Sequence, residues 1–309
     1  MKEKYPLKLQ PVFKETIWGG NRLKREFSKE CDLKRLAESW ELTCRKCEMN
    51  LITNGRYAGM TLGEYLGDFR GFPLLVKLID ANDSLSIQVH PDDDYARKNE
   101  GTAYGKTEMW YIVDALPGAQ IVYGLKEQFN RDKFSEAIRN GNLKGLLNYT
   151  DVHKGDVFFI PSGCVHAIGS GIIIAEIQQS CDITYRVYDY DRTDASGNKR
   201  ELHIEKALDV IKNFDKAEIE NLQFSNGTGE NIIVNCKYFR VRKITANAVI
   251  NTSDRFAHLL CLSGSGKIGN EIISKGDSFY IPAGTGDINF CCENAEILVS
   301  EPNLQLQSV

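Results

Sequence analysis

The feature that most constrains the fold of this chain is a nine-residue segment that occurs twice. Residues 155–163 read Gly-Asp-Val-Phe-Phe-Ile-Pro-Ser-Gly and residues 276–284 read Gly-Asp-Ser-Phe-Tyr-Ile-Pro-Ala-Gly, so six of the nine positions are identical. In each copy a Gly-Asp turn precedes an uncharged stretch with the composition of a buried strand, and Pro-x-Gly ends that strand. A repeat at an offset of 121 residues predicts two β-barrels of the same type in one chain.

The composition is that of a globular protein with a substantial core. The chain has 309 residues, of which 42% are hydrophobic and 26% are charged, enough for two domains. Its net charge of -4 disfavours a nucleic-acid-binding protein, because such proteins normally carry a basic face. No apolar stretch has the length of a membrane span, and residues 1–6 lack the apolar core of a signal peptide. Nine scattered cysteines predict free thiols. We therefore expect a cytoplasmic protein.

Strand patterns dominate the chain from residue 74 onward, so the predicted fold class is mainly β. The strands predicted in the first half are 74–81, 85–90, 109–116, 120–125, 156–161, 171–178 and 183–190. Those predicted in the second half are 232–236, 239–245, 256–262, 267–273, 278–281, 288–292 and 295–300.

Helical patterns interrupt the strands at three places. A capping box at 61–64 predicts a short helix. The i, i+3, i+4 spacing of apolar residues within 128–147 predicts a helical insertion between barrel strands, and the amphipathic pattern of 203–214 predicts a linking helix. Residues 215–231, rich in Asn, Glu and Gly, are expected to form a linker.

Polar residues at alternating positions of one predicted strand are candidate metal ligands. Ser86, Gln88 and His90 share one face of the strand, and Ile87 and Val89 share the other. A polar face that lines a barrel interior needs partners, because unpaired buried polar groups are costly, and a bound ion would supply one. The alternative is an edge strand whose polar face meets solvent.

Two further candidate ligands lie in neighbouring segments. Glu108 precedes an apolar strand, so its carboxylate is expected to be buried, although a surface glutamate at a strand start is the plain alternative. His166 follows the Pro-x-Gly turn of the first repeat and is expected at a strand mouth, although a lone histidine after a turn is usually a surface residue. At the same offset the second repeat carries Asp287, so only the first barrel is a candidate metal site.

Together the two histidines, the amide and the carboxylate supply two nitrogen and two oxygen donors without a thiolate. Such a set suits a catalytic Zn²⁺ or a comparable divalent ion better than a closed structural site. Cys44 and Cys47 form a Cys-x-x-Cys pair, but the chain has no second pair of this kind for a zinc ribbon. The pair is therefore a weaker candidate for metal or redox chemistry.

A second group of charged residues predicts acid–base and anion-binding chemistry. Glu176 lies on one predicted strand, and Arg186 lies on the next, with Thr184 and Tyr188 on its face. Lys106 stands at the beginning of the strand that carries the candidate glutamate ligand. Charged groups inside adjacent barrel strands would form a catalytic pair, whereas an exposed edge-strand position is the alternative for Arg186.

These motifs in combination resemble a known enzyme family. The pattern Gly-Asp-x3-Ile-Pro-x-Gly-x-x-His that ends at His166 resembles the second conserved motif of the cupins. The wider set resembles the type I phosphomannose isomerases over the full length, most closely their short bacterial form. The residues that carry this resemblance are Trp18-Gly-Gly, Glu38-Ser-Trp-Glu41, Leu85-Ser-Ile-Gln-Val-His-Pro91, Gly105-Lys-Thr-Glu-Met-Trp110, Ile160-Pro-x-Gly-x-x-His166, and Glu176 with Arg186.

The resemblance implies a fold of two cupin-type jelly-roll barrels. The first, at 1–231, would be the catalytic metal-binding domain with the helical insertion and the linking helix. The second, at 232–309, would be a degenerate barrel without a metal site. The zinc ligands that the family implies, one ion per subunit, are Gln88, His90, Glu108 and His166. The chain lacks the large helical domain of the longer family members, so contacts made there must be absent or replaced.

The reaction that the resemblance implies is the interconversion of mannose 6-phosphate and fructose 6-phosphate through an enediol. It moves a hydrogen between C1 and C2, so it needs a base, an electrophile and a clamp for the phosphate. Glu176 is the candidate base, and Zn²⁺ is the electrophile. The family implies that Arg186 is essential for turnover, and Lys106 and Arg186 are the cations that stabilise the enediolate or hold the phosphate. The expected partner is a small sugar phosphate, with no nucleic acid and no membrane.

Two other classes of protein share parts of this pattern. A non-catalytic sugar-phosphate-binding cupin would not need both Glu176 and Arg186. A metal-dependent cupin oxygenase would hold iron in a histidine-rich set, and Gln88 argues against that class because a neutral amide does little to support high-valent iron.

Overall fold

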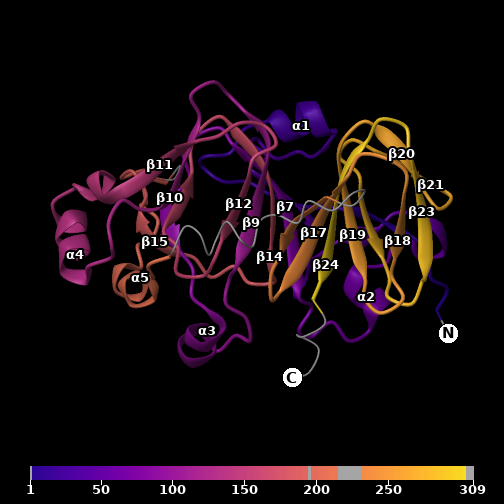
Figure 1. Cartoon of the computed structure of the whole chain (residues 1–309), viewed down its shortest axis with the longest axis horizontal. Helices are drawn as coiled ribbons and strands as arrows, with labels where there is room; N and C mark the ends of the chain where they lie inside the picture. Colours follow the sequence, from indigo (N-terminus) through magenta and orange to yellow (C-terminus); the bar gives the residue numbers. More distant parts are fainter. Residues whose placement is uncertain (1, 194–195, 215–230, 304–309) are drawn as a thin grey trace.

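The computed structural model describes residues 2–193, 196–214 and 231–303. Its four main sheets form two sandwiches (Figure 1). The first sandwich consists of a five-stranded and a six-stranded sheet. The five-stranded sheet has the order β11 (Leu147–Asp151), β10 (Gln120–Leu125), β13 (His166–Ile168), β8 (Ile87–Val89) and β15 (Tyr185–Tyr188). The six-stranded sheet has the order β12 (Val157–Ile160), β9 (Glu108–Ala115), β14 (Ile172–Gln179), β7 (Leu74–Ala81), β3 (Glu38–Leu42) and β2 (Val12–Lys14).

The second sandwich is built mainly from the C-terminal part of the chain. Its seven-stranded sheet has the order β16 (Asn231–Asn235), β17 (Phe239–Ile244), β24 (Glu296–Pro302), β19 (Ala257–Ser263), β22 (Ser278–Ile281), β1 (Leu7–Gln10) and β6 (Leu51–Ile52). Its four-stranded sheet has the order β18 (Ala248–Asn251), β23 (Asp287–Cys292), β20 (Ser265–Ile268) and β21 (Glu271–Ser274). A small hairpin joins β4 (Cys44–Arg45) to β5 (Glu48–Met49).

Side-chain alternation explains how these sheets stack. Along β7, Val76 and Leu78 face the seven-stranded sheet, where they join a buried apolar cluster with Leu260 and Leu298, while the intervening residues face the five-stranded sheet. A second cluster fills the space between the five- and six-stranded sheets, and a third fills the C-terminal sandwich. The two sandwiches therefore pack back to back through the six- and seven-stranded sheets.

Helices cover the outer face of the five-stranded sheet and mark the edges of the fold. The helices are α1 (Arg22–Phe27), α2 (Leu62–Leu66), α3 (Asp93–Glu100), α4 (Arg131–Arg139) and α5 (Ile204–Val210), with short 3-10 turns η1 (Gly55–Tyr57) and η2 (Leu143–Leu146). Figure 1 shows α4 and α5 at the outer end of the first sandwich. There Phe134 and Leu208 pack on Val89 and Val187. The capping box predicted at α2 is present, with Thr61 and Glu64 bonded to each other's backbone.

The mainly β class is confirmed, but the sheets are open rather than closed barrels. The five-stranded sheet ends at β11 and β15, which pair with one neighbour each. The predicted strand 267–273 is wrong, because a turn with Gly269 at φ +59 divides this segment into the antiparallel pair β20 and β21. The predicted linker at 215–231 falls almost entirely on residues 215–230, outside the described residues.

The sheets do not divide the chain at one point. Strands β1 and β6 come from the first 52 residues but complete the seven-stranded sheet, where β1 pairs with β22 of the second repeat. The most N-terminal strand, β1, thus belongs to the C-terminal sandwich and precedes, along the chain, all strands of the first sandwich. The domain boundary at residue 231 stays a prediction.

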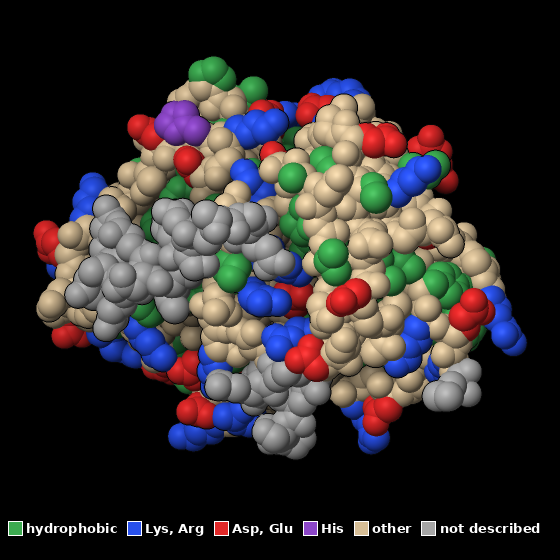
Figure 2. All heavy atoms as spheres, turned by 45° about the vertical axis from the view of Figure 1, so that its right-hand side comes forward, with side chains coloured by type: hydrophobic (Ala, Val, Ile, Leu, Met, Phe, Trp, Pro, Cys, Tyr) green, Lys and Arg blue, Asp and Glu red, His purple; other side chains and the backbone are tan. Residues whose placement is uncertain are grey.

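The distribution of charged side chains on the surface is consistent with the small net charge of the sequence. Figure 2 shows basic and acidic side chains interspersed on the visible face. Among the described residues no helix is long and apolar enough to cross a bilayer. All nine cysteines are free thiols, as predicted.

Candidate metal centre

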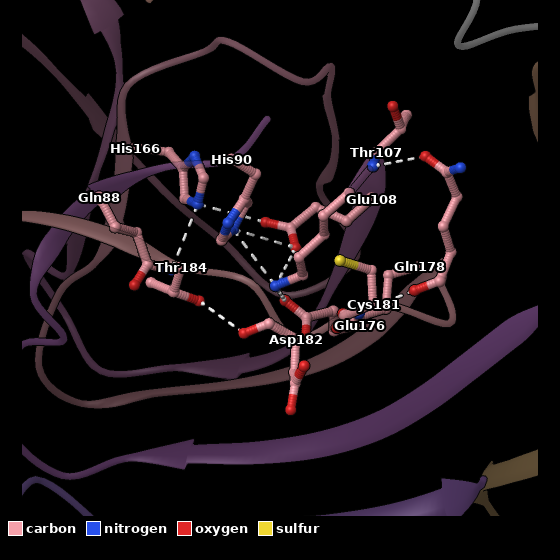
Figure 3. A network of polar contacts seen from close by, with 12 residues as sticks. Gln88, His90, Thr107, Glu108, His166, Glu176, Gln178, Cys181, Asp182 and Thr184 are labelled. Carbon is pink, nitrogen blue, oxygen red and sulfur yellow. Dashed lines mark hydrogen bonds and ion pairs between the residues drawn. The ribbon is translucent and has the colours of Figure 1, made fainter. Parts of the chain in front are cut away.

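Three of the predicted ligands converge between the two sheets of the first sandwich. One donor atom from each of His90, Glu108 and His166 lies within 4.8 Å of the others, and all three side chains are buried. His166 begins β13, Glu108 begins β9, and His90 follows directly after β8, so three strand ends meet at one point. Figure 3 shows these three side chains pointing toward one another.

Gln88 joins this group from the strand next to His166. The two residues are opposite each other in the β8–β13 ladder, and the Gln88 amide nitrogen lies 3.3 Å from His166 Nε2. Rotation of this amide by half a turn would present its oxygen in place of its nitrogen. The predicted alternation of the strand is confirmed, because Ile87 and Val89 face the covering helices.

Both histidines are held in the orientation that a metal ligand needs. His90 Nδ1–H donates to the Ile183 carbonyl at 2.8 Å, and His166 Nδ1–H donates to the Cys164 carbonyl at 2.9 Å. These bonds leave each Nε2 lone pair facing Glu108, at 3.7 Å from His90 and 3.3 Å from His166. Burial lowers the pKa of His166 to about 3 and that of His90 well below its usual value. Both imidazoles are therefore neutral, the form that binds metals.

The Glu108 carboxylate supports the same interpretation. It is completely buried, and neither oxygen accepts a well-aligned hydrogen bond, although the Lys106 ammonium lies 2.6 Å from Oε2. Burial raises the pKa of Glu108, the neighbouring Glu176 raises it further, and Lys106 opposes both effects. A buried carboxylate whose only close cation is one ammonium at one of its oxygens is incompletely compensated, which is costly. A divalent cation between this carboxylate and the two imidazoles would satisfy it, so the donor set fits a metal.

A buried carboxylate with two neighbouring ammonium groups adjoins the candidate ligands. Glu176, on β14, receives a hydrogen bond of 3.1 Å from Trp110 Nε1–H and lies between Lys106 at 3.7 Å and Lys77 at 3.3 Å. Burial alone would raise the pKa of Glu176, but the charges of the two lysines, together with hydrogen bonds that include the one from Trp110, outweigh this effect and hold the pKa below its ordinary value. Glu176 is therefore ionised, as a general base must be.

Arg186 lies on the opposite wall of the same interior. It pairs with Gln88 in the β8–β15 ladder, so Arg186, Gln88 and His166 form one row across three strands. The guanidinium is partly buried, its Nε has no hydrogen-bond partner, and burial together with nearby Arg200 lowers its pKa. Within the described residues, Asp189 and Glu201 attract the Arg186 guanidinium, but neither forms an ion pair with it. Arg186 is thus a cation on the strand next to that of Gln88.

Two sequence-based expectations about Arg186 are wrong. Its strand, β15, belongs to the five-stranded sheet, whereas the strand of Glu176 belongs to the six-stranded sheet. The two residues therefore face each other across the sandwich and do not lie on adjacent strands. A register shift after Arg186 places Tyr188 opposite Ile87, which faces the helices, so Tyr188 does not share the face of Arg186.

The second repeat has no comparable cluster. Among the described residues, the group around Glu108 is the one set of three or more His, Cys, Asp or Glu side chains with this convergence. Asp287, the counterpart of His166, is exposed on β23 and accepts a hydrogen bond from Asn251. In the Cys-x-x-Cys pair, Cys44 is buried and Cys47 is exposed.

A cavity of about 450 Å³ lies beside the segment that holds His90 in place, although none of the candidate ligands lines it. Its lining includes Arg45, Tyr104, Cys181, Asp182 and Ile183, and the backbone carbonyl of the last of these is the hydrogen-bond acceptor of His90. The volume lies within the range typical of small-molecule sites. The cavity wall is thus directly connected to one of the candidate ligands.

Sequence reasoning did not identify Lys77 or the indole of Trp110 as parts of this site. A signal for Lys77 was present, because it is the one charged residue in the otherwise apolar segment 74–79. A lysine inside a buried strand requires an acidic partner. The identity of that partner depends on which strand lies next to it, which the sequence does not specify.

Comparisons with known proteins point to one family. Residues 7–111 match the family model described as phosphomannose isomerase type I, catalytic domain. The chain is 38% identical over 316 residues to the probable mannose-6-phosphate isomerase GmuF of Bacillus subtilis, covering 96% of this chain and 99% of that protein. It is 39% identical over 293 residues to the mannose-6-phosphate isomerase of Streptococcus mutans, covering 90% and 92%.

Solved structures agree with this similarity. The mannose 6-phosphate isomerase of Bacillus subtilis superimposes with a TM-score of 0.85 at 34% identity, over 96% of this chain and 99% of that chain. The apo form of the Salmonella typhimurium mannose 6-phosphate isomerase gives a TM-score of 0.74 at 15% identity, over 96% and 99%, which shows a common fold.

Proposed function

Because the chain belongs to the type I phosphomannose isomerases, we propose that it interconverts mannose 6-phosphate and fructose 6-phosphate through an enediol. The observation that carries the proposal is the position of Glu176 and Lys106 directly beside a buried His–Glu–His cluster. An isomerase needs a base and a positive environment for an oxyanion at one place, and these residues provide both. A non-catalytic binding protein would not need them.

We propose that Gln88, His90, Glu108 and His166 hold one Zn²⁺ per subunit. One support is the donor set, which consists of two neutral imidazoles, a carboxylate and an amide, with no thiolate. The other is that each imidazole Nδ1–H donates to a backbone carbonyl, which fixes the orientation of both rings. When bound, the ion would supply Lewis acidity that polarises the oxygens at C1 and C2 of the sugar.

The side chains of the protein have different roles in the proton transfer. Glu176 removes the proton from C2 of the aldose and returns it to C1 of the enediol, while the hydroxyl proton moves from O2 to O1, which gives the ketose. The reverse reaction uses the same carboxylate. Trp110 Nε1–H donates to Glu176 Oε1 and orients it. Lys106, between Glu108 and Glu176, and Arg186, on the facing sheet, place positive charge where the enediolate develops. The low exposure of Lys106 and Glu176, 4% and 3%, strengthens these interactions because water is excluded.

We propose further that the sugar phosphate reaches the site through the cavity beside Ile183. The four open sheets correspond to two cupin-type jelly rolls. The α4–η2 segment is the helical insertion of the N-terminal jelly roll, and the C-terminal jelly roll is a structural partner that binds no metal. We also propose a cytoplasmic location and a small-molecule sugar phosphate as the partner. Free cysteines throughout the chain suit a reducing compartment.

A coupled assay for fructose 6-phosphate, with mannose 6-phosphate as substrate, tests the function. The purified protein should be active, a strong chelator should abolish the activity, and added Zn²⁺ should restore it. Metal analysis of the untreated protein should give one ion per chain. Full activity after complete removal of bound metal would refute the metal-dependent mechanism, and absence of activity in the metal-loaded protein would refute the isomerase assignment.

A further inference from the structure

Lys77 is a buried cation beside Glu176 to which the proposed proton transfer assigns no role. We propose that Lys77 is a positioning residue for the isomerisation, which holds the Glu176 carboxylate in the orientation that proton transfer needs. This inference rests on the proposed function of Glu176. It assigns Lys77 no contact with substrate or metal.

Four side chains in direct register form the framework of this proposal. Across four neighbouring strands of the six-stranded sheet, Trp40 is opposite Lys77, Lys77 is opposite Glu176, and Glu176 is opposite Trp110. Residues opposite each other in antiparallel strands point to the same face, so all four side chains enter the interior of the first sandwich. Lys77 is the only cation in this row.

The two oxygens of Glu176 have different partners. Oε1 accepts the hydrogen bond from the Trp110 indole at 3.1 Å. Oε2 is buried, accepts no well-aligned hydrogen bond, and faces the Lys77 ammonium at 3.3 Å. The Trp110 hydrogen bond at Oε1 and the Lys77 ammonium at Oε2 together fix the plane of the carboxylate. Without Lys77, Oε2 would lose its nearest charge, and the carboxylate would be free to turn toward Lys106, which now lies 3.7 Å from Oε1.

Lys77 is itself held from the side away from Glu176. Its ammonium lies 3.5 Å from Glu38 Oε2 and 5.1 Å from the centroid of the Trp40 ring. The Trp40 indole donates to the same Glu38 oxygen at 2.7 Å. Lys77 is only 7% exposed, and a buried ion pair by itself contributes little stability compared with an apolar residue of similar volume. Placement of Glu176 is a reason for a lysine here that stability alone does not provide.

The test compares Lys77→Met with a matched control, Lys29→Met. Lys29 is also buried, and its ammonium lies 2.7 Å from the buried Glu41 on the opposite face of the six-stranded sheet. With mannose 6-phosphate as substrate, Lys77→Met should lower kcat about 10- to 100-fold, the scale expected when a reacting group is misplaced by about 1 Å. Its KM and its bound zinc should stay within about twofold of wild type. Lys29→Met should lower Tm but leave kcat within about twofold.

A double-mutant cycle with Glu176→Gln decides whether Lys77 acts through Glu176. In the Glu176→Gln background, Lys77→Met should cause no further loss of kcat, because the group that it positions is already gone. This double variant buries neither charge of the pair, so it remains informative even where Lys77→Met alone does not fold. Lys77→Arg, which keeps the charge, should recover part of the lost kcat.

The outcomes separate this inference from the proposed function. Equal losses of kcat in Lys77→Met and Lys29→Met, loss of zinc in Lys77→Met, or a further fall in the Glu176→Gln background would each overturn the positioning role while wild-type activity stands. A wild-type protein that does not isomerise mannose 6-phosphate would overturn the proposed function, and the role of Lys77 with it.

Discussion

Replacement of Arg186 by alanine is the perturbation that tests the mechanism most directly. Within the part of the chain that the structure describes, its guanidinium forms no ion pair with a carboxylate, its Nε has no hydrogen-bond partner, and its strand lies next to that of Gln88. For an assumed separation of about 7 Å between the guanidinium and the enediolate, and an effective dielectric constant of about 20, two opposite unit charges attract by about 2.4 kcal/mol, or about 50-fold in rate. Removal of one donor to a developing oxyanion in known enzymes costs about 10²- to 10³-fold. We therefore expect kcat to fall between about 50- and about 1000-fold.

The assay is a coupled isomerase measurement over a range of mannose 6-phosphate concentrations, together with metal analysis of the same samples. Stabilisation of the enediolate predicts a lower kcat with unchanged zinc, whereas a grip on the phosphate predicts mainly a higher KM, because that interaction is equal in the ground and transition states. Arg186→Lys should rescue poorly, since lysine supplies charge without the planar fork. Arg131→Ala removes an arginine that pairs with Asp209 on the outer helices, and it should leave kcat unchanged. An Arg186→Ala protein with full zinc and near-normal kcat and KM would refute the reasoning.

The remaining predictions concern the metal ligands, acid stability and a helix cap. His166→Ala should remove bound zinc and activity together, whereas Asp287→Ala, on the exposed part of β23, should change neither in metal analysis and the coupled assay. Burial raises the pKa of Asp189, but hydrogen bonds and charge from Arg200 and Arg192 together outweigh it and hold that pKa below its usual value. The stabilisation from Asp189 is therefore present above its unfolded pKa of about 3.9 and is lost as pH falls through the folded pKa. The difference in Tm between wild type and Asp189→Asn should accordingly be smaller at about pH 3 than at about pH 7; an equal or larger difference would contradict this. Thr61→Ala should lower the free energy of unfolding by about 1 kcal/mol because it removes the cap of α2, and unchanged denaturant midpoints would contradict that role.

The sequence by itself determined most strands and the identity of the candidate ligands. Alternation of polar and apolar residues is a local property, so it placed Gln88 and His90 on one face of the segment that contains β8, opposite Ile87 and Val89, without knowledge of any neighbour. The repeated Gly-Asp…Pro-x-Gly segment likewise predicted that His166 and Asp287 occupy corresponding positions, and that the metal site belongs to the first copy.

Only the tertiary structure decided which side chains meet. Strand pairing joins residues that are far apart in the chain, and local patterns carry no information about which strands become neighbours. For this reason the placement of Arg186 on the sheet that faces Glu176, the shift of Tyr188 at a bulge, and the return of β1 to the C-terminal sheet were not predictable. The role of Lys77 was not predictable for the same reason, because its carboxylate neighbours Glu38 and Glu176 lie on the two strands that pair with β7.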